Sequence, residues 1–230
     1  MNPNRNEPMA DVRDMYMAHA NLRREISLMP KLIQDVAPGD TKRAEVVGEH
    51  ASMVCGILHQ HHEGEDLLLW PRLSERGGAE AEAIVPTMHA QHHAIEAANA
   101  EVSRLLPGWR ATARGGAELA AAFERLRAAL MEHLATEESQ LLPLAEKYVT
   151  AAEWKEMGEH GRRVTPKKYL ALITGMTMYE GDPEVIKGVL AEAPLLVRLI
   201  VPIVGRRAYA AHAKRVHGTA TPQRFSTPAR

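Results

Sequence analysis

Apolar residues recur at helical spacing in two matching stretches of the chain. One stretch contains Met15, His19, Leu22, Ile26 and Met29, and the other, displaced by 73 residues, contains Met88, His92, Ile95, Asn99 and Val102. Spacings of three and four residues place side chains on one face of an α-helix. Each stretch therefore predicts a helix whose buried face carries one histidine, and the displacement indicates a repeated unit.

Glycine, proline and aspartate separate four long predicted helices. We expect these helices over residues 9–35, 41–76, 79–106 and 116–147, because turn-forming residues follow each of the first three. Pro30 is expected to kink the first helix, and Pro71 and Pro143 to bend the second and the fourth. The predicted fold class is all-α, an up-down-up-down four-helix bundle.

Shorter helices are expected after the bundle. The expected organisation is a flexible lead (1–8), the bundle (9–160), a helical C-terminal extension packing on the bundle (161–218) and a disordered tail (219–230). Residues 195–204 are strongly apolar but too short, and too interrupted by Arg198 and Pro202, to span a bilayer. We expect this segment to pack on the bundle or on a second copy of the chain, with docking to a membrane surface as the less favoured reading.

The second and fourth predicted helices share a short motif. His61 precedes Glu65 by four residues, and 72 residues later His133 precedes Glu137 in the same way. Residues four apart share one helix face, so each motif directs an imidazole and a carboxylate toward one point. With His19 and His92 from the other two helices, the bundle would surround a pair of metal ions in its core.

The order and spacing of these elements resemble the hemerythrin-like proteins, or HHE cation-binding domain, over about residues 9–160. The resemblance implies a non-haem di-iron site, two iron ions (Fe²⁺/Fe³⁺) with an oxo or hydroxo bridge and two bridging carboxylates. Imidazole and carboxylate ligands suit Mn and Zn as well. Carried over by position, the metal ligands are His19, His61, Glu65, His92, His133 and Glu137.

Two differences from the oxygen-carrying hemerythrins argue against simple oxygen carriage. Their third helix has His-x-x-x-His, which here would select His89 and His93, whereas the apolar face selects His92. Their fourth helix has His-x-x-x-x-Asp instead of His-x-x-x-Glu.

Several further polar residues are candidates beside the site. Tyr16 and His89 lie near His19 and His92, the two histidines on the apolar helix faces, and are candidate extra ligands or redox groups. His93 is a weaker candidate ligand. His62 occupies the repeat position of apolar Leu134, so we expect it to face inward, and it is a further candidate redox group or hydrogen-bond partner of the ligands. His50, His59 and His93 are expected to be solvated or to act outside the ligand shell. Asp66 and Glu138 are expected to hydrogen-bond the ligand imidazoles. Gly64 either has no role or leaves room beside the metals for a small ligand.

The amino-acid composition restricts the kinds of partner and the location that we expect for the chain. The chain has 28 Lys and Arg against 29 Asp and Glu, a net charge of −1, so no nucleic-acid partner is expected. Residues 161–230 nevertheless carry 12 basic against 4 acidic residues, which leaves an anionic partner of this segment as an alternative. Cys55 is the single cysteine, and the first residues have no signal-peptide pattern, so a cytoplasmic location is expected.

Three functions are consistent with this pattern. The primary hypothesis is a cytosolic di-iron protein that binds or senses a small molecule such as O₂, H₂O₂ or NO. The second is a di-iron enzyme that removes hydrogen peroxide or nitric oxide. The third is an interaction module in which metal occupancy repositions the basic C-terminal segment.

Overall fold

A computed structural model describes residues 7–191 and 193–225 of the chain, and it is built from helices. The elements are α1 (Arg13–Gln34), α2 (Thr41–Leu68), α3 (Trp70–Arg76), α4 (Gly78–Thr112), α5 (Gly116–Thr136), the π-helix η1 (Glu137–Leu141), α6 (Leu142–Tyr148), α7 (Ala151–Val164), α8 (Lys167–Glu180), α9 (Pro183–Ala191) and α10 (Leu195–His217). The predicted all-α class is confirmed. No described helix is long and apolar enough to cross a membrane.

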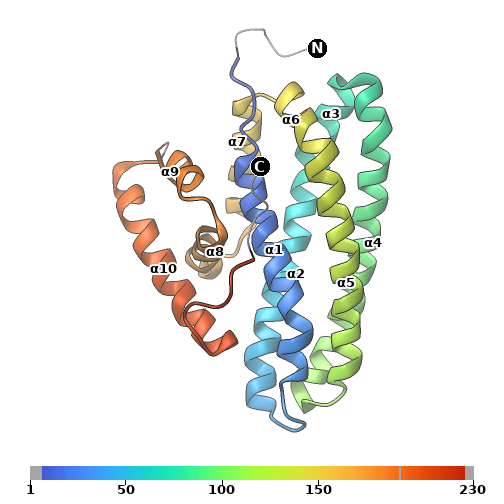
Figure 1. Cartoon of the computed structure of the whole chain (residues 1–230), viewed down its shortest axis with the longest axis vertical. Coiled ribbons are helices and arrows are strands. Elements are labelled where there is room, and N and C mark those ends of the chain that lie inside the picture. Colours follow the sequence, from blue (N-terminus) through green and yellow to red (C-terminus); the bar gives the residue numbers. More distant parts are fainter. Residues whose placement is uncertain (1–6, 192, 226–230) are drawn as a thin grey trace.

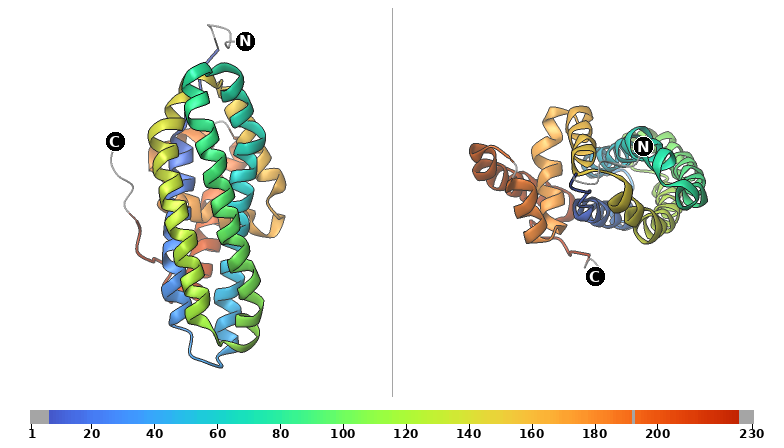
Figure 2. Two further views of the ribbon diagram at one scale, coloured as in Figure 1. Left: turned by 90° about the vertical axis from the view of Figure 1, so that its right-hand side faces the viewer. Right: turned by 90° about the horizontal axis from the view of Figure 1, so that it is seen from above.

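Four long helices run up and down side by side to form the bundle, as Figures 1 and 2 show from three directions. These are α1, α2 with its continuation α3, α4, and α5 with its continuations η1 and α6. Helix α7 lies along the upper part of α2, and α8, α9 and α10 stand together on the α1 side (Figure 1). The four-helix bundle expected from the repeat is therefore present.

The prolines affect the bundle helices differently, and the helix end expected at Pro107 is the one that differs from the prediction. Helix α1 continues through Pro30, and α4 continues through Pro107 to Thr112, where Trp109 is 3 % exposed. Burial of this large side chain outweighs the missing hydrogen bond at Pro107. Pro71 and Pro143 instead lie at the start of new helices, α3 and α6, as the expected bends require.

The N-terminal segment explains why α1 begins at Arg13 and not at residue 9. The Ala10 amide donates to the Val149 carbonyl at 2.9 Å, and the Ala151 amide donates to the Pro8 carbonyl at 2.8 Å. This short antiparallel pairing holds the chain extended before α1. At the other end, Tyr179 donates a hydrogen bond to the Pro222 carbonyl at 2.6 Å, while residues 226–230 of the expected disordered tail, like residues 1–6 of the expected lead, lie outside the described residues.

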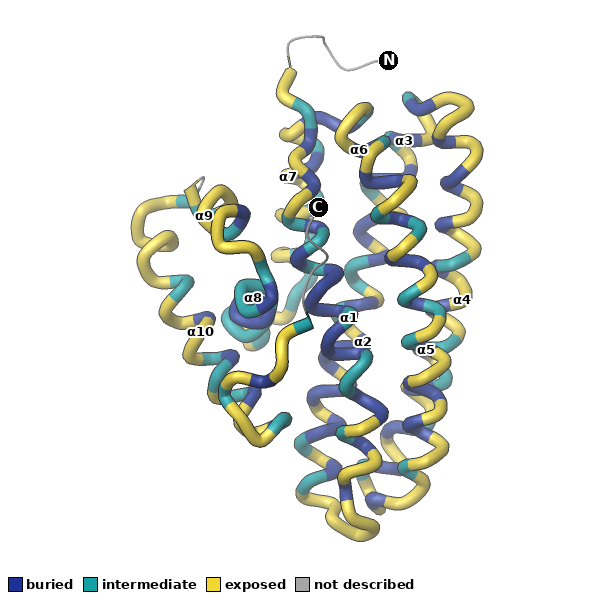
Figure 3. Tube along the Cα trace, viewed as in Figure 1, coloured by how far each residue is buried: buried dark blue, intermediate teal, exposed yellow. Residues whose placement is uncertain are grey.

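The bundle core consists of two apolar clusters with a polar layer between them. Along α1, Met15 belongs to one cluster and Leu22 to the other, with buried His19 between them; along α4, Met88 and Ile95 flank His92 in the same way. The buried stripes of the bundle helices, dark blue in Figure 3, run through both clusters. The repeated apolar pattern thus builds a dry core that is interrupted at one level by histidines and carboxylates.

Candidate metal centre

The polar layer brings together side chains from all four bundle helices. His19 comes from α1, Glu65 from α2, His92 from α4 and His133 from α5. Glu137 is the first residue of η1, where the Leu142 amide bonds back to the Glu137 carbonyl five residues earlier. This wider turn lies directly at the polar layer, and such π-helical turns are frequent at functional sites.

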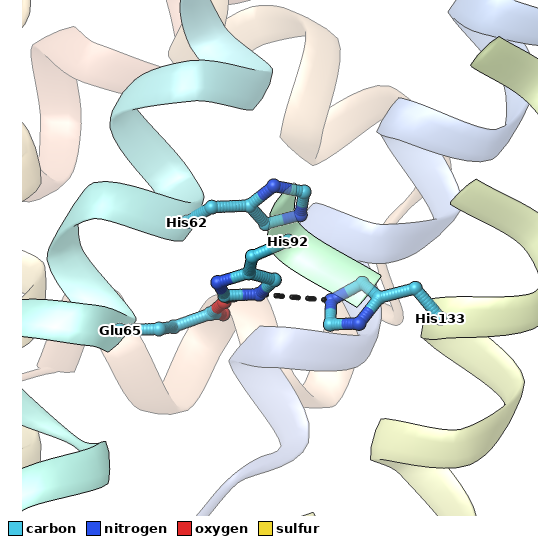
Figure 4. A group of neighbouring side chains, drawn as sticks. All are labelled: His62, Glu65, His92 and His133. Atoms are coloured by element: carbon cyan, nitrogen blue, oxygen red, sulfur yellow. Dashed lines mark hydrogen bonds and ion pairs between the residues drawn. The ribbon is translucent and has the colours of Figure 1, made fainter. Parts of the chain in front are cut away.

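One group of donor atoms joins α2, α4 and α5. It consists of His62, Glu65, His92 and His133, whose donor atoms all lie within 4.8 Å of one another (Figure 4). His92 Nε2 is 3.3 Å from His133 Nε2 and 3.5 Å from Glu65 Oε2. Ligands around an ion with bonds of about 2.1 Å are separated by about 3 Å, so these spacings suit a single cation.

A second group joins α1 and α2 and shares Glu65 with the first. It consists of His19, His61 and Glu65, with His61 Nε2 3.1 Å from Glu65 Oε1. Glu137 lies between the two groups, since its Oε2 is 3.3 Å from His19 Nε2 and 3.4 Å from His133 Nε2. Two carboxylates therefore lie where the two groups meet, an arrangement that can accommodate two cations.

Many of these atoms have no hydrogen-bond partner within the described part of the chain. They are both carboxylate oxygens of Glu65, both of Glu137, and Nε2 of His19, His61 and His62. Glu65, Glu137 and His19 are 0 % exposed, and a buried carboxylate without a partner costs several kcal/mol. Atoms that lie this close without bonding one another fit a bound cation, and the donor set of imidazoles and carboxylates suits Fe, Mn or Zn.

Carboxylates outside the layer hold two of the imidazoles. His92 Nδ1 lies 3.0 Å from Asp66 Oδ1, and His19 Nδ1 lies 2.9 Å from Glu138 Oε1. Arg23 in turn donates two hydrogen bonds of 2.8 Å to Glu138. Such contacts put the proton on Nδ1 and turn Nε2 toward the metal, as is usual for ligand histidines. The roles expected for Asp66 and Glu138 agree with this geometry.

Burial controls protonation within the layer. Burial and the nearby His19 lower the pKa of His61 to about 3, and burial and His133 lower the pKa of His92 to about 4. Neutral imidazoles offer the lone pair that a metal needs. Burial and the neighbouring Glu137 raise the pKa of Glu65 well above its usual range. Burial also acts to raise the pKa of Glu137, but His19 and His133 outweigh it and lower that pKa to about 2.

The three additional candidates from the sequence lie outside both donor groups. The His89 side chain is 48 % exposed and contacts Asp66 at 3.3 Å, beside His92. His93 is exposed, in agreement with its phase on α4. Tyr16 donates a hydrogen bond to the Glu138 carbonyl at 3.3 Å. These residues border the site, and the structure brings none of them among the donor atoms.

Two other histidines lie differently from what we expected. His62 faces inward as expected, but it joins the donor group with Glu65, His92 and His133, and its ring stacks on that of His92 with centroids 4.2 Å apart. His50 was expected to be solvated or near the ligands, yet it is 1 % exposed and hydrogen-bonds Glu25 at 3.0 Å, beneath α10. The inward direction of the His62 side chain could be predicted from Leu134, the residue at the same position of the repeat. The burial of His50 could not, because the helix that covers it, α10, is distant in sequence.

Comparison with known proteins agrees with this geometry. The family model described as the hemerythrin HHE cation binding domain matches residues 10–145, which contain every donor residue described above. No curated protein and no solved structure matches the chain. The chain belongs to the hemerythrin HHE cation-binding domain family.

Proposed function

We propose that the chain is a non-haem di-iron protein that binds or senses a small molecule such as O₂, H₂O₂ or NO in the cytosol. The observation that carries this proposal is the position of Glu65 in both buried donor groups. His19 and His61 would hold one ion, and His62, His92 and His133 the other. Glu65 and Glu137 would contact both ions and offset their charge.

The proposal for iron and for small ligands rests on the kind of site present. An iron pair, when bound, would supply open coordination positions and reversible transfer of electrons. The residues of the chain exclude bulk water, since the donor side chains lie between two apolar clusters. This enclosure favours a ligand of a few atoms over a larger substrate.

Metal analysis of the purified protein, with an optical spectrum of the same sample, tests this proposal. We expect about two irons per chain and near-ultraviolet bands of an oxo or hydroxo bridge. Zinc alone, or the absence of metal after reconstitution with ferrous iron under anaerobic conditions, would overturn it.

Removal of hydrogen peroxide or nitric oxide by turnover is a second candidate function. It is favoured by Tyr16, whose hydroxyl donates to the backbone carbonyl of Glu138, while the side chain of Glu138 holds the His19 imidazole. A phenol that borders the centre in this way is a candidate to exchange an electron with it. Steady consumption of peroxide by the iron-loaded protein, reduced in Tyr16→Phe, would support this candidate; binding without turnover would leave sensing or binding as the function.

A further inference from the structure

A pocket of about 160 Å³, partly open to the surface, lies next to the metal centre between α1, α2 and α7, and is called the cavity below. Its walls are mainly apolar and include Met15, Trp154 and Met157. His61 and Gly64 of α2 form the side that faces the centre, and His160 of α7 lies opposite. A cavity of about 150 Å³ in another protein holds benzene or xenon, so this space is ample for a molecule of two or three atoms.

His160 presents a hydrogen-bond donor in this cavity. The residue is 8 % exposed, and Arg163 donates to its Nδ1 at 3.1 Å. Because Nδ1 accepts this bond, the proton of the neutral ring lies on Nε2. Nε2 has no partner in residues 7–191 or 193–225. A buried N–H without a partner is costly, and a ligand in the cavity would supply the missing acceptor.

The cavity is connected to the metal centre through His61 and Gly64. His61 lines the cavity and its Nε2 is 3.1 Å from Glu65. Gly64 precedes Glu65, and a Cβ built on it would lie 3.7 Å from His160 Cδ2. His160 therefore packs over Gly64, with room for about one methyl group between them, and the absence of a side chain at Gly64 lets His160 approach the residues of the centre.

Helix α7 forms one wall of the cavity and lies beyond residues 10–145, the part that matches the family. Trp154 Nε1 donates to Asp14 at 2.9 Å, and Arg76 of α3 donates to Glu153 at 2.6 and 2.8 Å. Asp14 also lines the cavity, and burial raises the pKa of its carboxyl group. These bonds fix α7 on the bundle, so the cavity is bounded by a firmly attached wall.

We propose that this cavity is the chamber in which a small, uncharged ligand waits beside the metal centre, and that His160 Nε2–H binds the ligand there. The ligand class is a molecule of two or three heavy atoms with an acceptor end, as in H₂O₂, NO or O₂. This inference rests on the proposed function for its ligand, but the cavity itself belongs to the chain. His160 is thereby a positioning residue contributed by α7.

Nitric oxide binding to the reduced, iron-loaded protein tests the role of His160. His160→Phe keeps an aromatic ring and removes the donor. We expect its association rate to fall about threefold to tenfold, because one lost hydrogen bond lowers the occupancy of the chamber from which the ligand reaches the metals. His160→Gln, whose amide nitrogen reaches a similar position, is expected to restore most of the difference. Equal association rates in all three proteins would overturn the role of His160.

Filling the cavity tests the chamber. Gly64→Leu places a side chain in it, and Gly56→Leu is the matched control, because Gly56 lies on the same helix and a Cβ added to it would meet no atom within 4 Å. We expect slower nitric oxide association in Gly64→Leu alone. Gly64→Ala, whose Cβ makes an ordinary contact, is the variant to use if the leucine variant does not fold.

Xenon binding tests the chamber independently of the proposed function, because xenon enters a cavity whether or not a metal is bound. We expect xenon in the cavity of the wild type and of Gly56→Leu, and none in Gly64→Leu, by crystallography under pressure or by ¹²⁹Xe NMR. If no sample binds iron but this xenon pattern holds, the proposed function fails and the chamber stands. Iron-loaded proteins with equal association rates, or a wild type without xenon in the cavity, would overturn the chamber.

Discussion

Glu65 is the residue on which both donor groups depend. Burial and Glu137 make its carboxylate unfavourable in the metal-free protein, and a bound cation would reverse this. We expect Glu65→Gln to abolish binding of the ion pair and to remove several kcal/mol of metal-dependent stability. Metal analysis and thermal unfolding, each with and without iron, measure the two effects.

Glu63→Gln is the matched control for this substitution, because Glu63 is exposed on the same helix. It should change neither metal content nor stability. In the metal-free state, Glu65→Gln should unfold at the same temperature as the wild type or at a higher one, since the amide removes a repelled carboxylate. A lower unfolding temperature there, or full metal content, would contradict this account of Glu65.

The buried imidazoles predict that the metal-free protein is sensitive to acid. The pKa of His61 falls from 6.5 to about 3, and that of His92 from 6.5 to about 4, chiefly through burial. Below about pH 6.5 the unfolded chain binds protons at these histidines and the folded chain does not. Stability is therefore full above pH 6.5 and falls as the pH drops toward 4.

Denaturant unfolding of chelator-treated protein between pH 4.5 and pH 8 measures this effect. The raised pKa of Glu65 acts in the opposite direction, because the folded chain takes up a proton there at a higher pH than the unfolded chain, so each variant is compared with the wild type. We expect the wild type to lose about 2–3 kcal/mol more than His92→Gln between pH 8 and pH 4.5. The exposed His93 serves as control, so His93→Gln should follow the wild type. Equal slopes for the wild type and His92→Gln would show that this imidazole is not buried in the neutral form.

Repeat spacing predicted six of the seven residues that meet in the polar layer. His19, His61, Glu65, His92, His133 and Glu137 converge there because helical periodicity fixes direction as well as position. His62 was predicted to face inward but not to join the donor atoms. His62 follows His61 by one residue and so points to a different side of α2 from His61 and Glu65. The packing of α4 against α2 brings the ring of His62 onto that of His92.

At the scale of the elements, the effect of a proline on its helix was predicted correctly only where side-chain packing did not favour a continuous helix. The bends at Pro71 and Pro143 follow from the missing amide at the start of α3 and α6. The break expected at Pro107 is absent because buried Trp109 lies just beyond it. The π-helical turn at Glu137 occurs in one repeat only among the described elements, so the repeated sequence pattern did not predict it.

A close crossing of two glycines joins α8 to α10. A Cβ on Gly175 would overlap the carbonyl oxygen of Gly205, which is backbone and cannot rotate away. We expect Gly175→Ala to force the helices apart and to lower the free energy of unfolding by about 1–3 kcal/mol. Thermal unfolding and limited proteolysis within residues 167–217 measure the loss of this contact.

Gly188→Ala is the control for the helix crossing, because nothing lies within 4 Å of a Cβ at Gly188 in α9. It should be neutral or slightly stabilising, since alanine favours helix more than glycine does. Metal content should remain unchanged in both variants, as the centre lies in the bundle. Equal protease resistance of Gly175→Ala and Gly188→Ala would mean that the crossing is not close in solution.

At the scale of the whole molecule, α1 connects the metal centre to the C-terminal extension. It carries His19 toward the centre, and Arg24 and Glu25 toward α8 and α10. Arg24 pairs with Glu180 at 2.9 Å and donates to the Tyr209 hydroxyl, while Glu25 bonds His50. The sequence led us to expect that the C-terminal extension packs on the bundle. Neither the repeat nor the family match covers residues 167–217, however, so the sequence did not indicate which residues form this buried polar interface.

The first half of α10 leaves an apolar surface uncovered, within residues 195–204. Leu195, Leu196, Leu199, Ile200 and Ile203 are each between 52 % and 69 % exposed. Contiguous apolar surface of this kind usually marks an interface. We therefore expect the chain to self-associate through this segment, which the sequence also suggested.

Sedimentation velocity over a range of protein concentrations tests self-association. Leu199→Glu should shift the wild-type dimer or higher oligomer to monomer, because a buried unpaired carboxylate in an interface costs several kcal/mol. Leu67→Glu is the control, since Leu67 is 57 % exposed on the bundle, away from this segment. A wild type that stays monomeric at high concentration would contradict the prediction. In that case, flotation with anionic vesicles would show whether the same surface, followed by Arg206 and Arg207, binds a lipid surface instead.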